Sequence, residues 1–295
     1  MLALVPEHLG DIPGAVTYAE VPSRELSAEV EFYVPVYMGD LDYFEVMRHM
    51  PRLQVCQLLT AGYEHALDYL PSHTTMCNAA GVHDASTSEL AIGLILASLR
   101  GIDDFARAMA EGRWLHAPRT SLADSRVVII GAGGLGTAIA RRLDPFEVQI
   151  TLVGSKARTG VRGVGELDAL LPEADIVVIA VPLTSATRAM LDERTLGLLP
   201  DGALVVNVAR GPVIDSAALL AHVGRLRFAL DVTDPEPLPA EHPLWGAPGV
   251  LISPHVGGNS SAYPPRARAL VQAQISRLLA GEPLVNIVHR AAKQD

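Results

Sequence analysis

Three polar residues in the second half of the sequence each follow a run of apolar residues. Arg210 follows VVNVA, Glu236 lies just beyond ALDV, and His255 follows LISP. An arginine can bind a carboxylate through two parallel hydrogen bonds, and a histidine can exchange a proton near neutral pH. A neighbouring carboxylate orients a histidine ring and favours its protonated form. Together the three residues could bind an anionic substrate and protonate it. Taken singly, each also has a simpler interpretation: Arg210 as an ion pair at a strand end, Glu236 as a solvated acid, and His255 as part of a capped turn.

A glycine-rich motif precedes these residues in the chain. Gly131, Gly133 and Gly136 form G-A-G-G-L-G, directly after the apolar run RVVIIG and directly before a segment of helical periodicity. In a dinucleotide-binding turn the first glycine permits the tight turn and the second lets the backbone approach a pyrophosphate. The third glycine lets helix and strand pack closely, and the helix N-terminus faces the anion. Glycines could serve the turn alone, but this placement favours dinucleotide binding.

The segment after the next apolar run bears on which dinucleotide would bind. An NAD site would carry Asp or Glu about 20 residues beyond the glycines, where it binds the ribose 2′-hydroxyl. This sequence has Ser155, Lys156 and Arg158 there, and no carboxylate. Two cations and a hydroxyl suit a 2′-phosphate, so we predict NADP(H) in preference to NAD(H). The alternative is a solvated loop in which the cations bind no ligand.

The elements that would position these residues alternate regularly from position 126 onward. Six strand-length runs rich in Val, Ile and Leu lie at 126–131, 149–154, 174–182, 203–209, 227–232 and 249–255. The segments between them predict helices at 134–143, 166–172, 188–198 and 215–223, the last capped by Asp215 or Ser216. This alternation predicts an α/β fold with a doubly wound parallel sheet, a Rossmann dinucleotide-binding domain. Its ligands would bind at the carboxyl ends of the strands, where Arg210, Glu236 and His255 lie.

A helix with a clear start precedes this sheet. Ser86 and Glu89 form the capping-box pattern S-x-x-E ahead of the apolar run LAIGLILASL, so we expect a helix that begins at Ser86 and joins two domains. Before it the strand candidates EFYVPVYM and LQVCQLLTAG are shorter and interrupted by proline.

These features predict a second, smaller domain of flavodoxin-like α/β type. We assign the substrate domain to residues 1–92 and the dinucleotide-binding domain to residues 93–267. A helix is expected at 265–280, and the tail EPLVNIV after it returns to the first domain. The segment 268–295 would therefore complete the substrate domain.

The composition limits the class of protein. The chain has 295 residues, 49% of them apolar, which suits a soluble globular protein of two domains. Its 23 Lys and Arg against 33 Asp and Glu leave a net charge of −10, which disfavours nucleic acid as a partner. Cys56 and Cys77 lack the paired spacing of a zinc site, so we expect reduced thiols and no metal. No uncharged apolar run reaches the ~18 residues that cross a bilayer, and a secretory leader is missing, so we expect a cytoplasmic protein without membrane partners.

Taken in order, the motifs resemble those of the D-isomer-specific 2-hydroxyacid dehydrogenases, a family that includes the glyoxylate/hydroxypyruvate reductases and phosphoglycerate dehydrogenase. The matching segments cover nearly the whole chain and are TAGYEH (60–65), ASTSEL (85–90), GAGGLG (131–136), AVPLTSATR (180–188), LVVNVARGPVID (204–215), ALDVTDPEPLP (229–239), HPLW (242–245) and ISPHVGG (252–258). The resemblance implies an NAD(P)-dependent enzyme that reduces a small 2-oxo acid of the glyoxylate or hydroxypyruvate type to the D-2-hydroxy acid.

The resemblance also implies roles for single residues. Arg210 would bind the substrate carboxylate and polarise the carbonyl, His255 would donate and accept the proton, and Glu236 would be the partner of His255. The backbone amides of Ala61 and Gly62 would also hold the substrate carboxylate. The implied cofactor contacts, with Asp231 orienting the nicotinamide amide, are Gly131, Gly133, Gly134, Leu135, Gly136, Ser155, Lys156, Arg158, Val181, Pro182, Val208, Ala209, Asp231 and Gly257.

Several alternatives stay open within this resemblance. The family includes nucleotide-sensing corepressors, and the complete Arg, Glu and His set favours an enzyme over such a regulator. Formate dehydrogenases of the superfamily pair the catalytic histidine with Gln, so Glu236 disfavours formate, whereas a phosphite-type anion remains an alternative substrate. Family members are usually dimers in which a segment near 100–125 crosses to the partner, so we expect a homodimer.

Three aromatic residues have no settled role in the sequence. Tyr63 and His65 follow the Ala61–Gly62 loop, and they could set the size of the substrate or simply pack. Trp114 could lie at the dimer interface or in a buried structural position.

Overall fold

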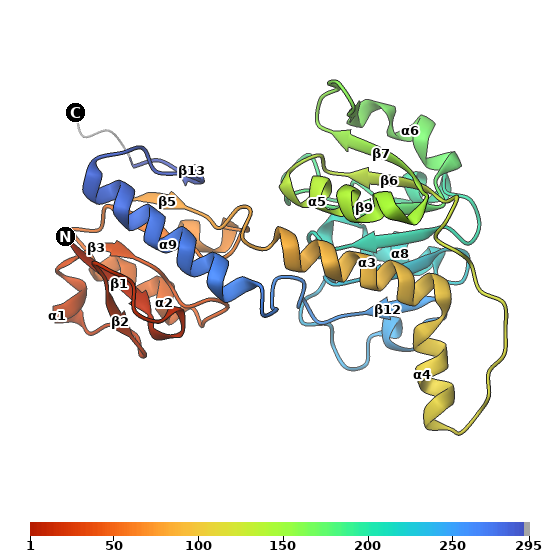
Figure 1. Ribbon diagram of the computed structural model, residues 1–295, viewed down its shortest axis with the longest axis horizontal. Coiled ribbons are helices and arrows are strands. Elements are labelled where there is room, and N and C mark those ends of the chain that lie inside the picture. The colour runs from red at the N-terminus through yellow and green to blue at the C-terminus, as the bar shows by residue number, and fades with distance from the viewer. Residues whose placement is uncertain (292–295) are drawn as a thin grey trace. The chain divides into compact units, whose positions relative to one another are not determined.

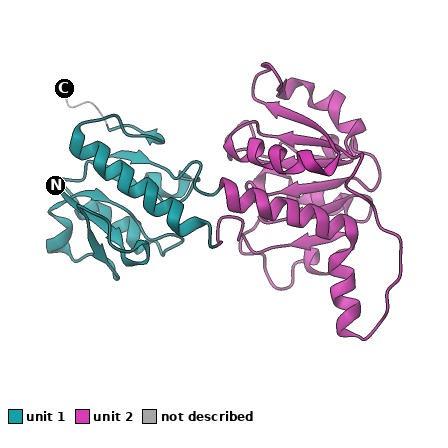
Figure 2. Ribbon diagram, in the orientation of Figure 1, with its two compact units in different colours: residues 1–83, 261–295 teal, residues 84–260 magenta. Residues whose placement is uncertain are grey.

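The computed structural model describes residues 1–291, and the chain divides into two compact units (Figure 2). Unit 1 comprises residues 1–83 together with the chain from Ser261 onward, and unit 2 comprises Asp84–Ser260. Each unit has its own sheet and its own hydrophobic core.

The boundaries between the two units lie at different positions from those that we predicted. The predicted boundaries at 92/93 and 267/268 fall inside helices α3 (Asp84–Arg100) and α9 (Tyr263–Ala280). The observed boundaries, at 83/84 and 260/261, lie before the first residue of each helix. A continuous helix is one rigid piece and therefore belongs to a single unit. Within the predicted segment 268–295, residues 292–295 lie outside the described part of the chain.

Unit 2 is built on a seven-stranded sheet of order β12-β11-β10-β9-β6-β7-β8, in which every pairing is parallel. The strands are β6 (Arg126–Ile130), β7 (Gln149–Gly154), β8 (Arg162–Gly163), β9 (Ile176–Ile179), β10 (Leu204–Asn207), β11 (Arg227–Leu230) and β12 (Val250–Ile252). All six predicted strands are confirmed, although several are shorter than the apolar runs. The two-residue edge strand β8 was not predicted, because two residues carry no periodicity.

The sheet of unit 2 is doubly wound. From β6 the chain adds β7 and β8 on one side and β9 to β12 on the other, so the strand order reverses between β6 and β9. Alternate residues enter separate cores, with Val128 and Ile130 on one face and Val127 and Ile129 on the other. Ligands of such sheets bind where the order reverses, and the glycine turn follows β6 at that point.

Two of the predicted helices of unit 2 are confirmed closely. Helix α5 (Gly134–Leu143) has the predicted bounds, and α8 (Ser216–His222) is capped by Asp215, whose side chain accepts a hydrogen bond from Ala218 N at 2.8 Å. The remaining helices of this unit are α3, α4 (Ile102–Ala110), α6 (Leu167–Leu170) and α7 (Glu193–Gly197). Figure 1 shows α3 along one face of the sheet, where it packs beside α5.

Two helix starts differ from the sequence prediction. Helix α3 begins at Asp84, so Ser86 lies within it and bonds Ser260 Oγ at 2.6 Å instead of capping the helix. The helix predicted over 188–198 begins only at Glu193, because Ala189 has a positive φ of 49° that an α-helix excludes.

Unit 1 holds a six-stranded sheet of order β13-β5-β4-β3-β1-β2. The strands are β1 (Leu2–Pro6), β2 (Val16–Tyr18), β3 (Val30–Tyr33), β4 (Val55–Gln57), β5 (Thr75–Cys77) and β13 (Ile287–His289). The order β2-β1-β3-β4-β5 is the flavodoxin-like order, as predicted. The tail does return to this unit, since β13 pairs antiparallel with β5, and the helices are α1 (Arg24–Ser27), α2 (Asp42–Glu45) and α9.

Within residues 1–291, a single helix that is both long and apolar enough to cross a membrane is not found. Helices α3 and α4 meet these criteria only as a pair, across a bend of 67°.

Candidate functional site

The glycine turn of unit 2 lies between β6 and α5, and packing requires glycine at two of its positions. Gly131 has φ +119°, and a Cβ there would lie 2.2 Å from the carbonyl oxygen of Ala180. A Cβ at Gly136 would lie 1.7 Å from the carbonyl oxygen of Gly131. At Gly133, by contrast, a Cβ would meet no described atom within 4 Å. The protein thus leaves open space at the position where a ligand would approach the backbone.

The predicted 2′-phosphate residues lie beside this turn. Ser155, Lys156 and Arg158 follow β7, the sheet neighbour of β6, and all three are exposed. Arg158 reaches back to the turn, where its Nη2 donates to the carbonyl oxygen of Ala132 at 2.8 Å. The structure therefore brings one predicted cation into direct contact with the glycine turn.

The other predicted cofactor residues follow neighbouring strands of the same sheet or begin α5. Val181 and Pro182 come after β9, and Val208 and Ala209 after β10. Gly134 and Leu135 form the first turn of α5. All of these positions lie at the carboxyl edge of the sheet.

Asp231 follows β11 and is buried, with 3% of its surface exposed. Its Oδ1 accepts hydrogen bonds from Ser253 Oγ at 2.7 Å and Val256 N at 3.0 Å, and its Oδ2 accepts one from Gly257 N at 2.9 Å. The backbone N of His255 also donates to the carbonyl of Asp231, at 2.8 Å. Asp231 therefore fixes the turn that carries His255, which sequence reasoning missed, while its contact with the nicotinamide amide stays a prediction.

His255 and Glu236 meet at this edge of the sheet. His255 Nδ1 donates a hydrogen bond to Glu236 Oε1, and both side chains are about one-third exposed, at 34% and 38%. The backbone of His255 has φ +51°, an uncommon value for a residue other than glycine. Within residues 1–291, His255 Nε2 has no hydrogen-bond partner, so this nitrogen is free to exchange a proton with a ligand.

Arg210 lies at the end of β10, and its loop is brought close to that of Glu236. A Cβ at Gly211 would lie 1.8 Å from the carbonyl oxygen of Thr233, so only glycine permits this approach of the two loops. Asn207 Nδ2 donates to the Arg210 carbonyl at 2.9 Å, and Arg210 Nη1 donates to the Ala209 carbonyl at 2.7 Å. The half-buried guanidinium therefore lies near enough to Glu236 for its charge to act on that carboxylate.

The charges of these three side chains act on one another. Burial by itself raises the pKa of Glu236, but the hydrogen bond from His255 and the positive charges of His255 and Arg210 outweigh burial. The pKa of Glu236 therefore lies below its usual value, and the side chain is ionised at neutral pH. An ionised carboxylate in this place accepts a strong hydrogen bond from the imidazole and fixes the orientation of the ring.

The loop predicted to bind the substrate carboxylate follows β4 in unit 1. Its carbonyls are held by side chains, since Asn78 Nδ2 donates to Ala61 O at 2.6 Å and Thr60 Oγ1 donates to Gly62 O at 2.7 Å. The amides of Ala61 and Gly62 have no acceptor in the described part of the chain. Consecutive unpaired amides of this kind can bind an anion.

Residues 92–257 match the family described as D-isomer specific 2-hydroxyacid dehydrogenase, NAD binding domain. This match covers more than half of the chain. The chain belongs to the D-isomer specific 2-hydroxyacid dehydrogenase family.

Proteins similar to this 2-hydroxyacid dehydrogenase agree with that assignment. A glyoxylate reductase of Thermofilum pendens is 32% identical over 259 residues, which cover 81% of this chain and 75% of that protein. A glyoxylate/hydroxypyruvate reductase A of Salmonella typhimurium is 32% identical over 256 residues, covering 81% of each chain. A crystal structure of a D-isomer specific 2-hydroxyacid dehydrogenase from Xanthobacter autotrophicus, in complex with NADPH and MES, has a TM-score of 0.79 at 29% identity and covers 98% of each chain.

The glycine turn of this dehydrogenase fits a nicotinamide dinucleotide. Gly133 offers the open space that a pyrophosphate needs, and Gly134 begins a helix whose N-terminal amides favour an anion. One acidic neighbour was not anticipated, because a Cβ at Gly134 would lie 2.4 Å from Oδ2 of Asp84. No sequence signal links two residues so far apart.

Among residues 1–291, no group of three or more His, Cys, Asp or Glu side chains could hold a metal ion. Cys56 and Cys77 are buried free thiols, and burial raises the pKa of Cys77 to about 11.

The three aromatic residues left open above have distinct surroundings. His65 lies edge-on to Phe44, with ring centroids 5.1 Å apart, and Tyr63 packs against the core of unit 1. These are packing contacts, and a role of either residue in setting the size of the substrate stays a prediction. Trp114 is 96% exposed, so the alternative of a buried structural tryptophan is wrong.

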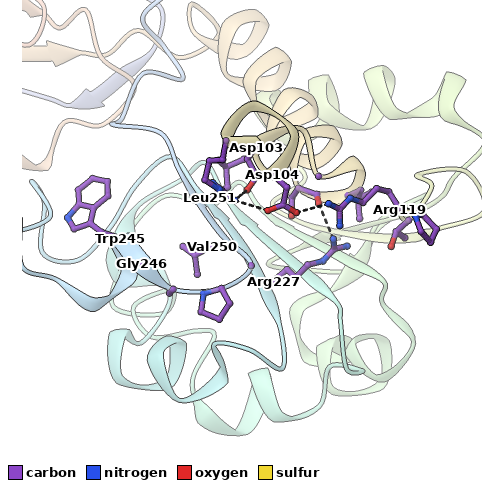
Figure 3. A pocket seen from close by; sticks show the side chains of 17 residues that line it. Asp103, Asp104, Arg119, Arg227, Trp245, Gly246, Val250 and Leu251 are labelled. Carbon is purple, nitrogen blue, oxygen red and sulfur yellow. Dashed lines mark hydrogen bonds and ion pairs between the residues drawn. The ribbon is translucent and has the colours of Figure 1, made fainter. Parts of the chain in front are cut away.

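A cavity of about 730 Å³ lies at the opposite edge of the unit 2 sheet (Figure 3). Arg227 and Val250, the first residues of β11 and β12, line it together with Asp104 of α4 and Arg119. Arg119 Nη2 and Asp104 Oδ2 are 2.9 Å apart. Since His255 and its partners follow the carboxyl ends of the strands, this cavity is separate from the candidate active site.

Proposed function

We propose that this dehydrogenase reduces a small 2-oxo acid of the glyoxylate or hydroxypyruvate type to the D-2-hydroxy acid. The observation that carries the proposal is the hydrogen bond between Glu236 and His255 beside the Arg210 guanidinium. This group offers one proton donor and one fixed cation, which a 2-oxo acid requires at its carbonyl oxygen and its carboxylate. The names of two similar proteins, glyoxylate reductase and glyoxylate/hydroxypyruvate reductase A, support the substrate class.

Each residue has a defined task in this reaction. Arg210 binds the substrate carboxylate and polarises the carbonyl, and the amides of Ala61 and Gly62 bind the carboxylate as well. His255 holds a proton at Nε2 and gives it to the substrate oxygen. Glu236, ionised at neutral pH, accepts the hydrogen bond from Nδ1 and fixes the orientation of the ring. The nicotinamide, when bound, supplies the hydride.

We further propose that NADP(H) is preferred to NAD(H). The exposed Ser155, Lys156 and Arg158 beside the glycine turn support this preference, and so does the absence of a carboxylate among residues 153–158. Replacing Lys156 with Ala should weaken NADPH binding and leave NADH binding unchanged, as measured by fluorescence titration. Equal losses for both cofactors would contradict the preference.

The homodimer is also a proposal, and the exposed apolar side chains of α4 and of the segment after it support it. Ile102, Met109 and Trp114 are 52%, 77% and 96% exposed. Apolar side chains gathered in one segment favour burial against another protein surface. Light scattering after gel filtration should give twice the chain mass for the wild type and a smaller mass for Trp114→Ser combined with Met109→Ser. A monomeric wild type would contradict the proposal.

The reaction itself is tested by following the oxidation of NADPH and NADH with a panel of 2-oxo acids. We expect turnover with glyoxylate and hydroxypyruvate, less with bulkier acids, and a D-configured product wherever the product is chiral. A protein that binds the cofactor and reduces none of these acids would contradict the proposal. That result would favour a regulatory role, while reduction of NADP⁺ by phosphite would favour an anion dehydrogenase.

A further inference from the structure

The backbone of the Ala61–Gly62 loop is oriented through its carbonyl groups. The carbonyl of Thr60 accepts from Ala79 N at 2.8 Å, that of Ala61 from Asn78 Nδ2 at 2.6 Å, and that of Gly62 from Thr60 Oγ1 at 2.7 Å. In a trans peptide the carbonyl of one residue and the N–H of the next point in opposite directions. Binding these three carbonyls therefore sets the directions of the N–H groups of Ala61, Gly62 and Tyr63.

One of these N–H groups already binds a carboxylate. Tyr63 N donates to Oε2 of Glu64 at 2.9 Å, whereas the N–H groups of Ala61 and Gly62 have no acceptor within the described chain. The loop thus presents three consecutive amides and satisfies one of them with an acid of its own. The other two can receive a carboxylate from a ligand.

Asn78, which directs the Gly62 amide, is itself held on every side. The residue is 8% exposed, and its Oδ1 accepts from Ala80 N at 3.2 Å. Its backbone N donates to Asn286 O at 3.0 Å, and its carbonyl accepts from Gln57 Nε2 at 3.0 Å. The Asn78 side chain therefore has little freedom to leave the Ala61 carbonyl.

Behind Asn78 a fully buried glutamine pair extends the network to the C-terminal segment. Gln274 Nε2 donates to Gln57 Oε1 at 2.8 Å and to Val285 O at 2.9 Å, and Gln274 Oε1 accepts from Val285 N at 3.0 Å. Both glutamines are 0% exposed. A buried network whose members are all satisfied is rigid, because breaking any bond leaves a polar group without a partner.

We propose that Asn78 is a positioning residue for substrate binding, which fixes the peptide plane that presents the Gly62 amide to the substrate carboxylate. This inference rests on the proposed role of Ala61 and Gly62. An asparagine suits the position because it donates to the Ala61 carbonyl and accepts from Ala80 N at the same time. An aspartate would keep the oxygen that accepts from Ala80 N, but it would replace the amide donor with a second oxygen facing the Ala61 carbonyl oxygen.

The variant Asn78→Asp tests the proposal with almost no change of shape. We expect KM for glyoxylate and the inhibition constant of oxalate, an unreactive dicarboxylate, to rise about tenfold, as expected for the loss of one hydrogen bond to a charged group. The value of kcat should change much less, and KM for NADPH should stay the same. Equal carboxylate affinity in the variant and the wild type would overturn the proposal, as would parallel changes in NADPH binding and thermal stability.

A matched control separates positioning from general stability. Thr74 Oγ1 donates to the Leu53 carbonyl at 2.9 Å, a buried bond of the same kind in the same unit, away from the loop. Thr74→Val should lower Tm without changing either carboxylate constant. If Asn78→Asp does not fold, Asn78→Ser, which also removes the bond to the Ala61 carbonyl, should raise both constants. Unchanged constants in Asn78→Ser would then overturn the proposal.

The wild type distinguishes failure of this inference from failure of the proposed function. A wild type that binds oxalate in the presence of NADPH and reduces no 2-oxo acid contradicts the function alone, and the oxalate affinity of Asn78→Asp still decides the inference. A wild type that does neither contradicts both.

Discussion

Glu236 and His255 are joined by a hydrogen bond from Nδ1 of the histidine to Oε1 of the glutamate, across 19 residues of sequence. They follow β11 and β12, which are neighbours in the sheet. The bond occupies one ring nitrogen and leaves Nε2 to exchange a proton. The first predictions concern this pair.

Replacing His255 with Asn removes the proton donor and should lower kcat by about 10²- to 10⁴-fold. Cofactor affinity should not change, because the glycine turn and the 155–158 segment are untouched. Stopped-flow reduction and NADPH titration measure the two quantities. A variant with wild-type turnover would remove His255 from the mechanism.

Replacing Glu236 with Gln should lower kcat for 2-oxo acids, because a neutral amide holds Nδ1 of His255 less strongly than an ionised carboxylate does. The stability effect has a defined sign. Because the folded pKa of Glu236 is depressed, the carboxylate stabilises the folded state above its ordinary pKa, and this stabilisation is lost as the pH falls through the folded pKa. The Tm difference between wild type and variant should therefore shrink on acidification from about pH 7 to about pH 3. A constant difference would contradict this interpretation.

Arg210→Lys should lower kcat/KM for 2-oxo acids by roughly 100-fold, since a point charge does not replace the two-pronged guanidinium. Arg225 provides the control, because its guanidinium donates to the backbone carbonyls of Leu196 and Leu199 away from the site. Arg225→Lys should reduce Tm and leave kcat/KM unchanged. Equal kinetics in Arg210→Lys and wild type would exclude the carboxylate clamp.

Gly133→Ala should weaken NADPH binding alone, whereas Gly136→Ala should also lower the stability of the fold. A Cβ at Gly133 meets no described atom within 4 Å, so this variant should keep its Tm and bind NADPH more weakly. A Cβ at Gly136 would lie 1.7 Å from the Gly131 carbonyl, so that variant should lose stability as well. Thermal melts with and without NADPH separate the two. Unaltered NADPH affinity in Gly133→Ala would argue against binding at this turn.

Asp84→Asn should tighten the binding of both NADPH and NADH by about threefold to tenfold at low salt, because it removes a negative charge beside Gly134. The gain should shrink as salt is added. Asp124→Asn, an exposed position ahead of β6, serves as the charge-matched control and should have no effect. Weaker binding in Asp84→Asn would mean that the carboxylate contributes a contact to the cofactor.

Local patterns in the sequence were sufficient for the elements that carry the chemistry. Six strands of unit 2, the bounds of α5 and the glycine turn were all predicted, because apolar periodicity and the freedom of glycine depend on neighbouring residues. The same locality caused the errors. Ser86 matches a capping box, but α3 begins earlier at Asp84, and the bond from Ser86 to Ser260 depends on a residue remote in the chain.

The sequence alone determined which chemistry is available, namely a guanidinium, an imidazole and a carboxylate that follow three strands of one sheet. The tertiary structure decided how those groups are held. Asp231 fixes the turn of His255, Gly211 lets the arginine loop approach Thr233, and Asn78 binds the Ala61 carbonyl. These contacts join residues that are distant in the sequence and become neighbours through the order of the strands in each sheet. A local sequence pattern does not contain that information.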